Sequence, residues 1–86
     1  MAEFVEVDLH GCAVDAGRVG YLLRMGVERA QRRRAGLRII HGRGQHVMAD
    51  LVQEILRQQR LEFVEGFANP GETRVDARDL LRHRWR

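Results

Sequence analysis

The spacing of apolar residues along this chain changes repeatedly between a period of two and a period of three to four residues. Residues 3–10 (EFVEVDLH) alternate, because Val5, Val7 and Leu9 share one parity while Phe4, Glu6, Asp8 and His10 take the other. Such alternation is typical of a strand with one covered face. From residue 14 to about residue 33 the spacing becomes helical, with apolar positions at Val19, Leu22, Leu23, Val27 and Ala30.

The first helix carries two unusual features. Gly17, Gly20 and Gly26 each cost about 1 kcal/mol relative to alanine in a helix, and we expect close packing against a sheet to be the reason. Ala13 stands where a capping residue would be expected, so we expect the start to be frayed or capped in another way.

A second strand and a second helix follow. Residues 37–40 (LRII) form a short β-branched run, and a strand that follows a long helix is normally parallel to the preceding strand through a right-handed crossover. Residues 47–60 have the most regular amphipathic pattern of the chain.

The last part of the chain reads as two further strands, over residues 61–67 and 73–77, joined by a turn at Pro70 and Gly71 into a hairpin. The order β-α-β-α-β-β predicts an α/β fold: a two-layer sandwich in which two helices cover one face of a four-stranded mixed sheet and leave the other face partly open.

At 86 residues the chain has the length of one domain. We assign residues 1–77 to the folded domain and residues 78–86 to a basic C-terminal tail, which either forms one helical turn with Leu80, Leu81 and Trp85 on one side or is disordered.

Composition narrows the functional classes. The single cysteine, Cys12, excludes an internal disulfide and a multi-thiolate metal site, and the apolar runs are too short for a membrane span or a signal peptide, so we expect a soluble cytoplasmic protein. All 15 basic residues are arginine against 12 acidic residues. Arginine suits phosphate contacts, although coding bias produces the same enrichment. Arg32, Arg33 and Arg34 complement the dipole at the far end of the first helix, and we expect them to face away from the site.

Two histidine motifs end the first two strands. In parallel βαβ units, ligands collect at the carboxyl ends of the strands, because the helices that follow begin there. DLHG (8–11) and HGRG (41–44) both fall at that edge. Gly42 and Gly44 allow a backbone to approach an anion at a helix start, although a tight turn that needs positive φ explains them equally well.

Asp8 and His10 are two residues apart on one strand, so both face the open side, where an aspartate can orient an imidazole. The alternative is a merely polar strand face. His41 has the parity of Leu37 and Ile39, and is either a site residue or a hydrogen-bonded histidine at the rim of the core. Arg18, one turn into the first helix, is positioned to meet a phosphate together with Arg43.

The motifs VDLHG (7–11) and IIHGRG (39–44), at this spacing and followed by a Pro-Gly turn before a strand, resemble the small MutS-related (Smr) domain over about residues 5–76. The resemblance implies an α/β sandwich that binds DNA or RNA, with members described as nicking DNA or cleaving RNA, sometimes in ribosome-linked quality control. It places Asp8 and His10 at the positions proposed for cleavage, and His41, Gly42 and Gly44 in the nucleic-acid-binding turn. Cys12 and Ala13, and Gln45 and His46, depart from the usual family pattern.

These observations favour an endonuclease in which Asp8, His10 and His41 act on a phosphodiester held by Arg18, Gly42, Arg43, Gly44 and Gln45. A non-catalytic module that grips DNA or RNA phosphates is the alternative, and a protein-interaction domain is a third. Sequence leaves the cofactor open: a divalent ion such as magnesium or manganese near Asp8 would assist cleavage, but one carboxylate and scattered imidazoles form no metal signature.

Overall fold

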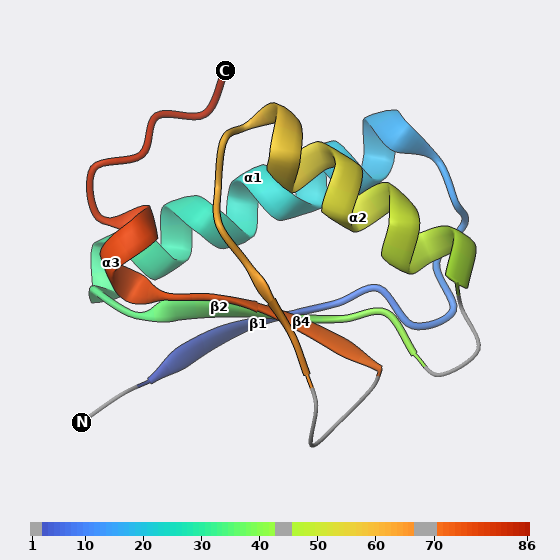
Figure 1. The fold of residues 1–86 in the computed structure, drawn as a ribbon, viewed down its shortest axis with the longest axis horizontal. Coiled ribbons are helices and arrows are strands. Elements are labelled where there is room, and N and C mark those ends of the chain that lie inside the picture. Colours follow the sequence, from blue (N-terminus) through green and yellow to red (C-terminus); the bar gives the residue numbers. More distant parts are fainter. Residues whose placement is uncertain (1–2, 43–45, 67–70) are drawn as a thin grey trace.

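The computed structural model describes residues 3–42, 46–66 and 71–86. A four-stranded mixed sheet forms one layer and two long helices pack over one of its faces (Figure 1). A third, short helix lies at one end. The predicted two-layer α/β sandwich is therefore confirmed.

The sheet has the strand order β1-β2-β4-β3. Its strands are β1 (Phe4–Asp8), β2 (Gly36–Ile40), β3 (Val64–Glu65) and β4 (Glu72–Val75). β1 and β2 are parallel, as the crossover predicts, while β4 pairs antiparallel with both β2 and β3. The third strand is shorter than the predicted 61–67, and the fourth ends at Val75 because residue 77 already starts a helix.

The helices are α1 (Ala16–Arg33), α2 (His46–Gln58) and α3 (Ala77–Leu80). α1 begins two residues later than the pattern predicts, because the Asp15 carboxylate accepts a hydrogen bond from the Arg18 backbone N–H at 3.1 Å and caps the helix there. The apolar positions of α1 and α2 meet β1, β2 and β4 in one core.

Only one of the three glycines of α1 is explained by close packing. A Cβ on Gly26 would lie 2.3 Å from Val7 Cγ2 and 3.1 Å from Leu37 Cδ1, so the helix can approach the sheet only with glycine here. Gly20 has no atom within 4 Å of such a Cβ, and Gly17 meets only the Asp15 carboxylate at 3.9 Å. The expectation that all three glycines serve packing was therefore wrong for two of them.

The C-terminal segment folds back onto α1. The side-chain amide of Gln31 donates to the carbonyl oxygens of Leu80 at 2.8 Å and His83 at 2.6 Å. Leu80 is fully buried, whereas Leu81 is 55% exposed, so these two leucines do not share a side as predicted. The helical-turn alternative for this segment is the one observed.

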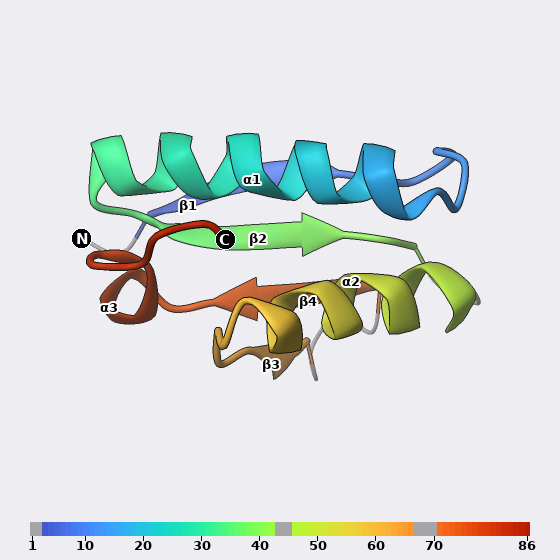
Figure 2. The same ribbon diagram turned by 90° about the horizontal axis from the view of Figure 1, so that it is seen from above.

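The molecule has two ends that differ in the elements that meet there. β1 and β2 finish at the end where α1 and α2 begin, which we call the site end; α1 finishes beside α3 at the opposite end, which we call the tail end (Figures 1 and 2). This arrangement follows from two successive strand-to-helix connections that both turn back over the same face of the sheet.

Candidate nucleic-acid interface

The two histidine motifs lie side by side along the backbone. Asp8 and Ile40 are register partners in the parallel pair of β1 and β2, and the Leu9 N–H donates to the Ile40 carbonyl at 2.7 Å beyond the end of β1. The residue after Ile40 is His41. The sheet therefore brings the residues around Asp8 and His41 together at the site end.

The side chains of Asp8 and His41 nevertheless lie on opposite faces of the sheet. Asp8 alternates with Val7 and Leu9, which are buried under the helices, so its carboxylate faces the open side. His41 continues the parity of Ile39, which pairs with Val7 on the helix-covered side. The sheet thus separates Asp8 from the His41 ring.

Asp8 and His10 form a local turn at the end of β1. Asp8 Oδ1 accepts a hydrogen bond from the backbone N–H of His10 at 2.9 Å, and both residues are exposed. Within the described residues the carboxylate holds the His10 backbone and makes no hydrogen bond to the imidazole. Asp8 therefore fixes where His10 sits, while the His10 ring faces solvent.

His41 is built into the core rim. It is 4% exposed, and its Nε2 lies 3.0 Å from the hydroxyl oxygen of Thr73 on β4. The backbone N–H groups of His41 and Gly42 both donate to the Gly71 carbonyl, at 2.8 and 3.0 Å. These contacts fasten the end of β2 to the start of β4 and correspond to the hydrogen-bonded core histidine considered from sequence.

The predicted phosphate-binding residues are only partly described. Gly42 has a φ of 89°, which explains why glycine stands there. Its N–H is already engaged by Gly71, and Arg43, Gly44 and Gln45 lie outside the described residues.

Arg18 lies in the first turn of α1, at the site end, with an exposed side chain. The N-terminus of α1 is occupied by the Asp15 carboxylate, so this helix start has its own internal anion. An external phosphate would accordingly contact the Arg18 guanidinium rather than the backbone N–H groups that Asp15 caps.

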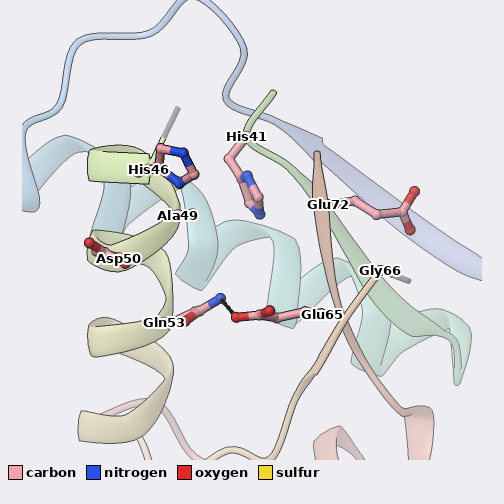
Figure 3. A pocket seen from close by; sticks show the side chains of 8 residues that line it. All are labelled: His41, His46, Ala49, Asp50, Gln53, Glu65, Gly66 and Glu72. Carbon is pink, nitrogen blue, oxygen red and sulfur yellow. Dashed lines mark hydrogen bonds between the residues drawn. The ribbon is translucent and has the colours of Figure 1, made fainter. Parts of the chain in front are cut away.

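A pocket of about 460 Å³ opens between α2 and the hairpin, next to His41 (Figure 3). Sequence reasoning did not find it, although His46, Asp50 and Gln53 recur at helical spacing on one side of α2. The Gln53 amide donates to the Glu65 carboxylate at 2.7 Å across the pocket. The complete lining is His41, His46, Ala49, Asp50, Gln53, Glu65, Gly66 and Glu72. Because Asp50 and Glu65 are carboxylates, this pocket disfavours phosphate.

The open face of the sheet carries a compensated charge network. Arg38 contacts Glu6 and Glu72, each at 3.0 Å, and Arg74 also pairs with Glu72. Burial raises the pKa of the Glu72 carboxyl, but hydrogen bonds from Arg74 and Arg38, together with their charges, outweigh burial and hold the pKa below its ordinary value of 4.5. Both arginines are therefore committed to glutamates, which leaves them poorly suited to phosphate.

Two further properties concern the described residues as a whole. Within ranges 3–42, 46–66 and 71–86, no three histidine, cysteine, aspartate or glutamate side chains are grouped so that they could hold a metal ion. In the same part of the chain, no helix combines the length and apolar character needed to cross a membrane.

Comparison with known proteins gives one result that covers most of the chain. The family model described as Smr domain matches residues 7–77, which contain both histidine motifs and the hairpin. A search of the curated proteins finds no match.

Proposed function

Because this chain belongs to the Smr domain family, we propose that it binds the sugar–phosphate backbone of DNA or RNA at the site end and cleaves a phosphodiester bond there. The family is associated with nuclease activity or nucleic-acid binding. The observation that carries the cleavage step is the Asp8–His10 turn: the His10 imidazole is exposed, and its backbone is fixed by the Asp8 carboxylate beside the end of β2.

His10 acts as the proton carrier in this proposal. Its imidazole takes a proton from water or from a ribose 2′-hydroxyl, and that oxygen forms a bond to phosphorus while the bond from phosphorus to the leaving oxygen breaks. The proton then passes from His10 to the leaving oxygen, so that the ring returns to its starting state. Asp8 is a positioning residue, because its carboxylate acts on the His10 backbone.

Charge stabilisation is assigned to the residues around this turn. The Arg18 guanidinium is exposed at the site end and has no acidic partner within ion-pair distance among the described residues. Arg43, Gly44 and Gln45 complete the proposed phosphate site. Gly42, whose N–H is bonded to Gly71, contributes the positive φ of the turn. His41, which is buried against Thr73, positions this turn by holding the end of β2 to β4.

A non-catalytic binding module is the second candidate. It is favoured by the same contact that fixes His10, because a carboxylate bonded to the backbone does not orient or charge-stabilise the imidazole directly. In that case the site end holds phosphates without acting on them.

The test is incubation of the full chain with branched DNA, single-stranded RNA and structured RNA, including a ribosomal RNA hairpin, with and without magnesium or manganese. Comparison of the reactions with and without metal shows whether cleavage requires a divalent ion. The ribosomal hairpin tests the ribosome-linked role that the family resemblance predicts. We expect cleavage that is lost in Asp8→Ala/His10→Ala while binding is retained. Glu54→Ala, which removes an exposed carboxylate from α2, should leave cleavage unchanged.

Binding without cleavage of any substrate would replace the nuclease by the binding module. Absence of salt-dependent binding to every nucleic acid in the panel would overturn both and leave the protein-interaction domain.

A further inference from the structure

A group of arginines at the tail end is not explained by the proposed site. Arg32 and Arg33 finish α1 and Arg34 caps it, and residues 78–82 lie at the same end, where the Gln31 amide donates to the Leu80 carbonyl. From His83 the chain turns back to Gln59, so Arg84 lines a hollow with Arg24 and Glu28 further back along α1. We define the arginine patch as Arg32, Arg33, Arg34 and Arg82, all of which are exposed.

The patch arginines lack ion-pair partners, as do Arg18 and Arg60 among the described residues, and they differ from those two in being clustered. Arg24, Arg38, Arg57 and Arg74 each lie within ion-pair distance of a glutamate. None of the four patch arginines has an acidic partner within that distance among the described residues. Residues 32–34 and 78–82 together hold five arginines and one aspartate, with the carboxylates of Glu3 and Asp76 at the same end. The excess positive charge is therefore concentrated here.

Arg34 adds a conformational observation. It caps α1 with a φ of 55°, in the left-handed region where glycine is normally found. A non-glycine residue at such a position costs stability. Arg34 therefore stands where the backbone conformation would favour glycine.

From these observations we propose that the arginine patch is a second binding surface for nucleic-acid phosphates, separate from the site end. This inference rests on the proposed function, which supplies the class of ligand. The local acidic residues are too few to neutralise the patch, and guanidinium groups without partners are suited to phosphate oxygens.

The length of α1 sets the spacing between the two surfaces. Its 18 residues correspond to about 27 Å at about 1.5 Å per residue. A duplex that spans both ends therefore needs about eight base pairs at about 3.4 Å each. Shorter duplexes can engage only one surface at a time, so affinity should rise once the duplex exceeds this length.

The experiment compares two double variants that remove the same charge. Arg33→Gln/Arg82→Gln changes the patch, and Arg24→Gln/Arg57→Gln changes two arginines that are paired with glutamates elsewhere on the helices. Binding of DNA and RNA hairpins with stems of about 4 and about 12 base pairs is measured by fluorescence anisotropy over a salt series, in a His10→Ala background to prevent cleavage.

We expect the patch variant to bind the long stem about tenfold more weakly, with a salt slope shallower by about two, because two phosphate contacts are lost. Short-stem binding should fall much less, and the paired-arginine variant should stay close to the parent. Arg33→Lys/Arg82→Lys should recover most of the affinity, since the charge is restored.

If both glutamine variants bind the long stem equally weakly, the effect is one of net charge and the proposed second binding surface is wrong. Unchanged long-stem binding in the patch variant would also overturn it, while leaving the proposed function intact. If the parent binds neither stem, the proposed function itself fails. If Arg33→Gln/Arg82→Gln binds hairpins like the parent but no longer binds the phosphatidylserine vesicles that the parent binds, the ligand of the patch is an anionic membrane surface instead of a nucleic acid.

Discussion

The Nε2 atom of His41 lies 3.0 Å from the hydroxyl oxygen of Thr73, and both side chains are almost completely buried. This contact joins the end of β2 to β4 on the helix-covered face, directly beside the pocket shown in Figure 3. It also joins two residues that are 32 positions apart in sequence. The end of β2, from which the HGRG segment leaves the sheet, is therefore held in place by a strand formed near the end of the domain.

Removing the hydroxyl should destabilise the fold. Thr73→Val keeps the shape of the side chain but leaves a ring nitrogen of His41 buried without its partner, at a cost of about 1–3 kcal/mol in the free energy of unfolding. Urea denaturation monitored by circular dichroism measures this cost. Thr73→Ser, which keeps the hydroxyl, should retain more of the stability than Thr73→Val; the reverse order would show that packing rather than the hydrogen bond dominates.

Glu72 should make stability depend on acidity. Its folded-state pKa is below the ordinary 4.5, so its contribution is complete above that pH and is lost as pH falls through the lowered value. Glu72→Gln should lower the free energy of unfolding at neutral pH by about 1–3 kcal/mol. This is less than for a fully buried ion pair, because Arg38 and Arg74 are partly exposed to solvent.

The matched comparison is Glu54→Gln, which breaks an exposed pair with Arg57. Denaturation at a series of pH values should show a shallower acid loss for Glu72→Gln than for the parent protein and for Glu54→Gln. Parallel curves for all three proteins would contradict the assigned role of Glu72.

Two glycines on the same helix should respond in opposite directions. Gly26→Ala forces a Cβ against Val7, and the overpacking should outweigh the gain in helix propensity by about 1–2 kcal/mol. Gly20→Ala meets nothing within 4 Å and should stabilise α1 by about 0.5–1 kcal/mol. Thermal unfolding of the two variants is a direct check, and equal shifts would refute the packing account.

Arg34 offers a test that separates stability from binding. Arg34→Gly relieves the left-handed backbone and should stabilise the protein by about 0.5–1 kcal/mol, while Arg33→Gly, inside α1, should destabilise it by about 1 kcal/mol. Both variants remove one patch charge, so both should weaken long-stem binding. A stabilised Arg34→Gly protein that binds like the parent would remove Arg34 from the patch.

The order of strands and helices was predictable because apolar spacing is a local property. Val5, Val7 and Leu9 alternate, and the helical spacing from Val19 to Ala30 follows directly. Proximity of the two histidine motifs also followed from the sequence, since parallel strands joined by a helix end at one edge.

Alternation along each strand already indicated that Asp8 and His41 point to different faces of the sheet. The register between β1 and β2 was needed to establish it. The Asp15 cap was missed although the residue is local, because the apolar pattern alone placed the helix start too early. Three features depend on long-range contacts that no local pattern records: the Gln53–Glu65 pair across the pocket, the burial of Glu72 between two arginines, and the docking of segment 78–86 on Gln31.

The sequence by itself determined which side of each strand and helix is buried, because the buried side follows from the spacing of the apolar residues within that element. Only the tertiary structure decided what covers it and which polar groups meet across elements, because such contacts depend on strand register and on chain segments brought together from distant positions. For this protein the first part gave the sandwich and the edge that carries Asp8, His10 and His41. The second put those side chains on two faces and gathered unpaired arginines at the opposite end.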